Sequence, residues 1–94
     1  MIVLRGSGQL KLDDVRVTIR SGRSEERLIS GLEHPVPWDR MTLRIVRSDG
    51  TSYDIDAESG TVIETSAKTR WQVTTPSVVG PFERWTVGFE EIDH

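Results

Sequence analysis

The chain has 94 residues, which is enough for one domain spanning residues 1–94 with a single modest core. It is 35% hydrophobic and 29% charged, with a formal net charge of -3, as is typical of a folded globular protein. Cys is absent, which excludes disulfides, thiolate metal sites and a cysteine nucleophile. The opening segment MIVLR turns charged too soon for a signal peptide, so we expect a cytoplasmic protein.

Apolar and polar residues alternate along most of the chain, and no useful window shows the spacing of an amphipathic helix. This pattern predicts an all-β fold of about seven to eight short strands. Two architectures fit, a single small antiparallel barrel of SH3-like size or a two-sheet sandwich. The residues predicted to face inward are Leu10, Leu12, Val15, Val17, Ile19, Met41, Leu43, Ile45, Tyr53, Ile55, Ile63, Trp71, Val73, Trp85, Val87 and Phe89.

The register of neighbouring strands follows from the turns, because a slip of one residue would move apolar side chains to the wrong face. A two-residue turn at Asp13-Asp14 places Leu12 opposite Val15. Three-residue loops at 48–50, 58–60 and 66–68 each place apolar residues opposite one another, giving the pairs Ile45 with Tyr53, Ile55 with Ile63, and Ile63 with Trp71. We therefore predict a continuous four-stranded meander over residues 41–74, with an outward row of Arg44, Asp54, Glu64 and Arg70.

Three segments interrupt the alternation. Segment 33–39 contains Pro35 and Pro37, and segment 76–82 begins and ends near prolines, so both are predicted to be loops. Segment 20–27 is polar and is predicted to form a turn.

The groups needed for catalysis are scarce. Of the two histidines, His34 lies between Glu33 and Pro35, and neither belongs to a recognisable nucleophile motif. The acids from Asp54 onward have the spacing of a calcium loop only as far as Ser59, where that loop requires glycine. We therefore predict a protein that is not an enzyme, with no cofactor and no metal site.

Binding is the remaining class of function, and two aromatic residues suggest where it would occur. Trp38 follows the two prolines of segment 33–39, and Phe82 follows Gly80-Pro81. An aromatic side chain in such a loop either closes the end of the core or anchors a partner. The predicted binding surface therefore contains Trp38 and Phe82, with His34, Asp39 and Arg40 beside Trp38.

A second candidate surface is basic. Residues 1–47 hold nine Lys or Arg against six acids, whereas residues 48–94 hold three against nine. Arginines in such a half would meet phosphates or an acidic partner. The residues concerned are Arg16, Arg20, Arg23 and Arg27.

The sequence thus favours a small intracellular, non-catalytic module that binds another protein, as an adaptor, inhibitor or assembly subunit. One alternative is nucleic-acid binding through the arginine face, although the acidic net charge weighs against it. The other is a homo-oligomer formed by pairing of edge strands. A membrane partner is not expected.

Overall fold

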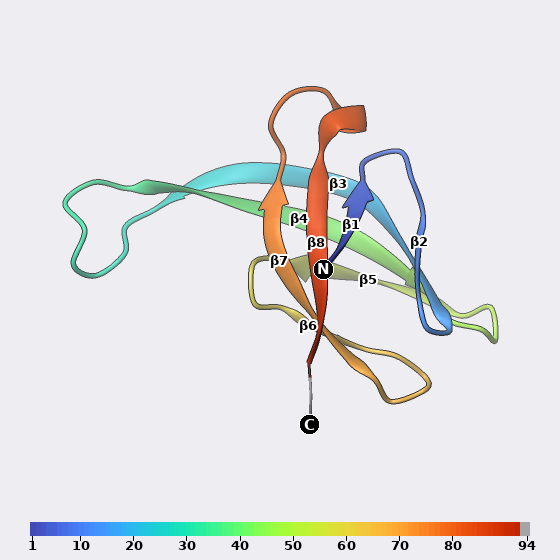
Figure 1. Cartoon of the computed structure of the whole chain (residues 1–94). Helices are drawn as coiled ribbons and strands as arrows, with labels where there is room; N and C mark the ends of the chain where they lie inside the picture. The colour runs from blue at the N-terminus through green and yellow to red at the C-terminus, as the bar shows by residue number, and fades with distance from the viewer. Residues whose placement is uncertain (93–94) are drawn as a thin grey trace.

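The structure, a computed structural model that describes residues 1–92, consists of two antiparallel four-stranded sheets (Figure 1). One sheet, called here the β8 sheet, has the order β1-β8-β7-β6; the other, the β3 sheet, has the order β2-β3-β4-β5. Over the described residues the sheets do not close into a barrel, so the all-β prediction is confirmed in its sandwich form. The elements are β1 (Ile2–Arg5), β2 (Leu10–Leu12), β3 (Val15–Arg27), β4 (Val36–Val46), β5 (Ser52–Ala57), β6 (Val62–Glu64), β7 (Arg70–Ser77), the 3-10 turn η1 (Phe82–Arg84) and β8 (Thr86–Ile92).

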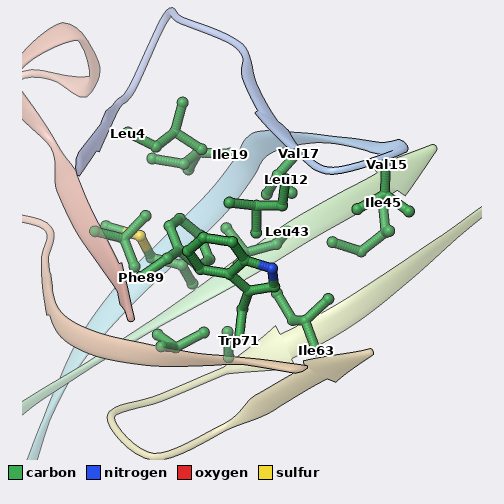
Figure 2. Close-up of a cluster of buried hydrophobic side chains, with 14 residues drawn as sticks. Leu4, Leu12, Val15, Val17, Ile19, Leu43, Ile45, Ile63, Trp71 and Phe89 are labelled. Carbon is green, nitrogen blue, oxygen red and sulfur yellow. The ribbon is translucent and has the colours of Figure 1, made fainter. Parts of the chain in front are cut away.

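The core lies between the two sheets, and its side chains come from the alternating positions of the strands (Figure 2). Among the predicted inward residues, Leu12, Val17 and Phe89 are fully buried. Trp71 is also buried, whereas Tyr53, Ile55 and Trp85 pack against the core while staying partly exposed. Alternation therefore identified most of the core, because each strand has one face against the other sheet and one against solvent, but it missed the buried Leu4 and Ala57.

A polar contact joins the two sheets at one end of the sandwich. Asp13, in the β2–β3 turn, accepts hydrogen bonds from the Thr69 hydroxyl and from Trp71 Nε1, the latter at 3.2 Å. Thr69 in turn bonds the hydroxyl of the buried Thr65 at 2.7 Å. These bonds lower the pKa of the Asp13 carboxyl, so the ionised form stabilises this end of the fold.

Three of the four predicted strand registers are confirmed. Leu12 lies opposite Val15, and Ile63 lies opposite Trp71. Ile45 lies opposite Tyr53 across a turn in which Gly50 has a φ of +87°. That left-handed conformation is the reason a glycine ends the three-residue loop.

The continuous meander over residues 41–74 is wrong at its centre. β5 pairs with β4 in the β3 sheet, whereas β6 pairs with β7 in the β8 sheet, so the chain changes sheets at residues 58–61. Ile55 and Ile63 therefore contribute to one core from opposite sheets and do not form a cross-strand pair. The predicted outward row divides into two separate pairs, Arg44 with Asp54 and Glu64 with Arg70.

The largest departure from the sequence prediction is the length of β3 and β4. Segment 20–27 is not a turn, because β3 continues to Arg27, and segment 33–39 is a loop only as far as Pro35, because β4 starts at Val36. Pro37 lies opposite Glu26, on the part of β4 that extends past its pairing with β5. A proline is tolerated there because an edge position does not need its N–H in the ladder.

The extra length forms a two-stranded projection, called here the arm (residues 23–40), with a tip at residues 28–35. In Figure 1 the tip lies at the far left, well away from β7 and β8. The molecule accordingly measures 46 Å along its longest axis and 21 Å along its shortest. Its radius of gyration of 13.8 Å exceeds the value of about 12 Å expected for a compact domain of this length.

The close approach of the segment after β1 to η1 can be tested at Gly6. A Cβ atom on Gly6 would lie 1.7 Å from the carbonyl oxygen of Phe82, because the chain after β1 passes directly against η1. We expect Gly6→Ala to lower the free energy of unfolding by about 2 kcal/mol or more, measured by urea denaturation. Gly8→Ala is the matched control, since its nearest neighbour would be 3.4 Å away. Equal stability of the two variants would contradict the close approach.

Candidate functional site

The two faces of the arm carry different residues, as the β3–β4 register dictates. Residues alternate across a strand, so Arg23 and Arg40 share the face turned away from the β8 sheet, whereas Gly22 and Met41 share the face turned toward it. Trp38, which lies opposite Glu25, belongs to the outward face. Trp38 is therefore a strand residue in a two-stranded ribbon and not the loop residue that the sequence predicted.

Glu58, the first residue after β5, holds the outward face of the arm together. Its Oε2 atom accepts hydrogen bonds from Trp38 Nε1 at 2.8 Å and from Arg40 Nε at 3.1 Å. Arg27 Nη2 lies 3.3 Å from the same oxygen, and the Arg27 guanidinium stacks over the Trp38 ring at 4.5 Å from its centroid. The hydrogen bond from Trp38 is the main cause that lowers the Glu58 pKa, followed by the bond from Arg40. Trp38 is consequently half-buried and held at both its edge and its face.

A second carboxylate extends this network along β5. Asp56 Oδ2 lies 3.3 Å from Arg23 Nη2 and 3.6 Å from Arg40 Nη1. Arg23 also contacts Glu25 on its own strand. Three arginines of the arm are therefore paired with acids, and their positive charge is largely neutralised in place.

The inward face is fixed by the connection between β7 and β8. Asp39 accepts a hydrogen bond from the Ser24 hydroxyl at 2.6 Å and another from the Val78 backbone N–H at 3.0 Å. A Cβ on Gly22 would lie 2.7 Å from Val78 Cγ1 and 3.0 Å from Trp85 Cζ3, so glycine lets these side chains pack onto the ribbon. The base of the arm is thus clamped between Glu58 on one side and Val78 with Trp85 on the other.

The two predicted aromatic anchors are not brought together. Phe82 lies in η1 and stacks edge-on against Trp85, with ring centroids 5.2 Å apart. Trp85 packs on the inward face of the arm, whereas Trp38 lies on the outward face. The ribbon therefore separates Trp38 from the Phe82–Trp85 pair. Phe82 is 37% exposed and His34 is exposed in the tip loop, far from Phe82 along the arm.

The tip presents an apolar surface that the sequence analysis did not single out. Leu28 is 66% exposed, Leu32 48% and Ile29 37%. The Leu32 N–H donates to the Ile29 carbonyl at 3.0 Å, and Gly31, with a φ of +90°, occupies the third position of that turn. A positive φ at this position is typical of a type II turn, which sets Ile29 and Leu32 side by side at the end of the arm.

The remaining predicted arginines lie on the outward face of the β3 sheet, over the sandwich itself. Arg20 is the extra residue in the β-bulge between Ile19 and Ser21, and its charge helps to lower the pKa of Asp54. Asp54 is paired mainly with Arg44, at 3.0 Å. Arg16 lies directly opposite Lys11. The charges of the basic and acidic halves of the chain therefore neutralise one another where β5 lies beside β4 and supplies acids to the arginines of β3 and β4. They do not do so at Arg16.

The sequence analysis did not single out several residues that build this region, although the sequence pattern contains an indication of some of them. Glu58 was considered only as a turn residue, because its contacts with the arm depend on strands whose lengths were underestimated. The tip could have been noticed as three aliphatic residues within five positions of a non-alternating segment. The opposition of Lys11 and Arg16 was implicit in the correct register of the Asp13-Asp14 turn.

The chemistry available here suits binding. The pKa values of Glu58, Asp54 and Asp13 are all lowered, chiefly by hydrogen bonds from Trp38, from Arg44 and from Thr69 respectively. Ionised carboxylates of this kind hold ion pairs and are poor proton donors at neutral pH. In residues 1–92 no group of three or more potential ligands is placed to hold a metal ion. Over the same residues, no helix has the length and apolar character needed to cross a membrane.

Comparison with known proteins gives no relative: the chain matches no family model, no curated protein and no solved structure. The geometry of these residues is therefore what indicates a function.

The three tryptophans allow the carboxylate contacts to be tested directly. The indole N–H of Trp38 donates to Glu58 and that of Trp71 to Asp13, whereas that of Trp85 donates to the Gly80 carbonyl at 3.0 Å. Because both carboxyls have lowered pKa values, their contribution to stability is complete at neutral pH and is lost only as the pH falls below about 4. In an NMR titration toward acid, we expect the Trp38 and Trp71 indole signals to shift with midpoints below the ordinary carboxyl range.

The Trp85 indole is the internal control, since a backbone carbonyl does not titrate and its signal should stay in place until the protein unfolds. A Trp38 midpoint at or above the ordinary range of glutamate would contradict the contact with Glu58.

Proposed function

We propose that this protein is a non-catalytic module that binds another protein through the tip of its arm. The observation that carries the proposal is the exposed aliphatic cluster of Leu28, Ile29 and Leu32, placed at the end of a projection and outside the core. Apolar side chains gain about 25 cal/mol for each Å² removed from water. A partner with an apolar groove would cover these three residues and gain that free energy.

The way in which the arm is held supports the proposal. Two-stranded ribbons are marginal in water by themselves. Here the outward face is fastened by Trp38, Arg27 and Arg40 to Glu58, and the inward face by Asp39 to Val78. A preorganised ribbon loses less conformational entropy on binding than a mobile loop would. Trp38 and its neighbours thus act by positioning the tip, and the tip makes the contact.

Phe82 remains a candidate for a second contact. It is exposed to the same degree as Ile29, and its edge-on packing against Trp85 fixes its ring. Because Phe82 lies on the body and not on the tip, a partner that used both would have to follow the inward face of the arm toward η1.

The alternative of nucleic-acid binding along the whole arginine face is less favoured. Arg23, Arg27, Arg40 and Arg44 are each in ion pairs with carboxylates of β5 or of the residue after it. Pairing with phosphates would have to compete with those contacts. Self-association is an outcome of the experiment below, and a cytoplasmic location stays a prediction from the sequence.

The test is a photo-crosslinking amino acid placed at position 32, compared with the same group at Val79, which is 75% exposed on the body. In lysate of the source organism, we expect position 32 to form a defined adduct that position 79 does not form. Identification of the adduct by mass spectrometry distinguishes another protein from a second copy of this chain. Identical adducts from both positions, or none from position 32, would overturn the proposal.

Substitution of Leu32 measures how much the tip contributes to the affinity for the partner. With the captured partner, we expect Leu32→Ser to weaken binding by about tenfold or more. Its free energy of unfolding should stay within about 0.5 kcal/mol of the original, because the side chain is exposed. Val79→Ser removes a similar exposed aliphatic group and should leave affinity unchanged.

A further inference from the structure

A small hollow lies at the end of the β3 sheet, between the β2–β3 turn and the β4–β5 loop. Its volume is about 430 Å³, and three basic residues line it, namely Lys11, Arg16 and Arg47. Its lining residues come from β2, β3, the end of β4 and the turns between them, which Figure 1 places at the opposite end of the β3 sheet from the tip of the arm. We call it the basic hollow.

Two of these cations face each other in an arrangement that is unfavourable by itself. Lys11 and Arg16 are directly opposite in the β2–β3 pairing, and both point outward because Leu12 and Val17 point into the core. Side chains in such positions have Cβ atoms about 5 Å apart, and like charges there are destabilising. By contrast, Arg44 on the same face lies opposite Asp54 and is paired with it at 3.0 Å.

In the described residues no direct ion pair compensates the cations of the basic hollow, although, after the hydrogen bonds from Thr51, the charge of Arg47 helps to lower the pKa of the neighbouring Asp49. Within residues 1–92, Lys11, Arg16 and Arg47 form no ion pair with a carboxylate, whereas four other arginines do. One carboxylate, Asp14, also lines the hollow. Its Oδ1 atom is buried without a hydrogen-bond partner in the described part of the chain, and none of the ion pairs found there involves Asp14. The lining therefore carries three positive charges against one negative charge.

Arg47 is turned away from the other two cations, because it shares a strand face with Ile45 and Tyr53, which face the core, whereas Arg16 lies opposite the outward Val46. The Arg47 guanidinium stacks over the Tyr53 ring at 4.7 Å from the centroid, and the Arg47 backbone N–H is bonded to the Thr51 carbonyl at 2.8 Å. The stacked guanidinium thus belongs to a neighbouring hollow that Glu64 and Lys68 also line, and the cations that face the basic hollow directly are Lys11 and Arg16. Ser48 adds a hydroxyl to the same lining.

We propose that the basic hollow binds a phosphate group. The guanidinium group of Arg16 and the ammonium group of Lys11 suit the charge and the several acceptor oxygens of a phosphate, which arginine can meet with paired hydrogen bonds. A bound phosphate would also remove the repulsion between Lys11 and Arg16. The shared chemistry is the phosphate oxyanion, supplied either by a small phosphorylated molecule or by the backbone of a nucleic acid.

The experiment is an NMR titration of the intact protein at fixed ionic strength, monitoring the backbone amides of Arg16, Ser48 and Gly50. The probes are inorganic phosphate, pyrophosphate and a single-stranded oligonucleotide. Saturable shifts confined to this end of the sheet are expected with at least one probe. Saturation by phosphate or pyrophosphate assigns a small ligand, and saturation by the oligonucleotide alone assigns a nucleic-acid backbone.

Three variants make the result specific. We expect Arg16→Gln to weaken binding by about tenfold or more, since it removes a charge-assisted contact. Asp14→Asn should tighten binding, because it removes the one negative charge from the lining. Arg5→Gln, on β1 in the other sheet, is the control with the same change of net charge and should leave the affinity unchanged.

The absence of saturable shifts with all three probes would overturn the proposal. So would an equal loss with Arg5→Gln and Arg16→Gln, because that result would indicate attraction by overall charge alone. Leu32→Ser should not change phosphate binding, so the basic hollow and the protein-binding tip stand or fall independently.

Discussion

β3 and β4 are longer than the strands beside them, and this mismatch determines the shape of the molecule. β2 pairs with β3 over three residues and β5 pairs with β4 over six, so the remaining hairpin extends past the sandwich as the arm. A ribbon of two strands cannot bury a hydrophobic face of its own, so its order has to come from contacts at its base. Glu58 provides those contacts on one face and Asp39 on the other.

The same contacts give a structural role to the residues that the sequence analysis placed in a binding site. Trp38 and the arginines Arg23, Arg27 and Arg40 are gathered on one face, but they are engaged with Glu58 and Asp56. An aromatic ring fixed in this way stabilises the ribbon that carries the tip. Both proposals rest instead on groups that the described structure leaves exposed or without an ion pair, namely the aliphatic tip and the outward cations Lys11 and Arg16.

Local rules predicted the strand pairs that are joined by tight turns. The turn at Asp13-Asp14 and the glycine at position 50 each fix a register, because the wrong one would expose a row of apolar side chains. The same reasoning failed at residues 58–60, although Gly60 also has a positive φ. β6 pairs with β7 in either arrangement, and whether it also pairs with β5 depends on packing between distant segments, because Ile55 and Ile63 face the core in both cases.

The sequence by itself determined the all-β class, the identity of most core residues and the registers of the short hairpins, since alternation and turn chemistry act between near neighbours. Only the tertiary structure decided that the strands form two sheets, that β4 begins at Val36, and that Trp38 bonds Glu58. The physical reason is that these features depend on pairing and packing that turn and alternation rules do not reach: Trp38 and Glu58 are 20 positions apart, and Val36 pairs with Arg27 across the tip. A proline such as Pro37 interrupts a strand by local rules but is accepted on an edge, and which positions become edges is a property of the whole fold.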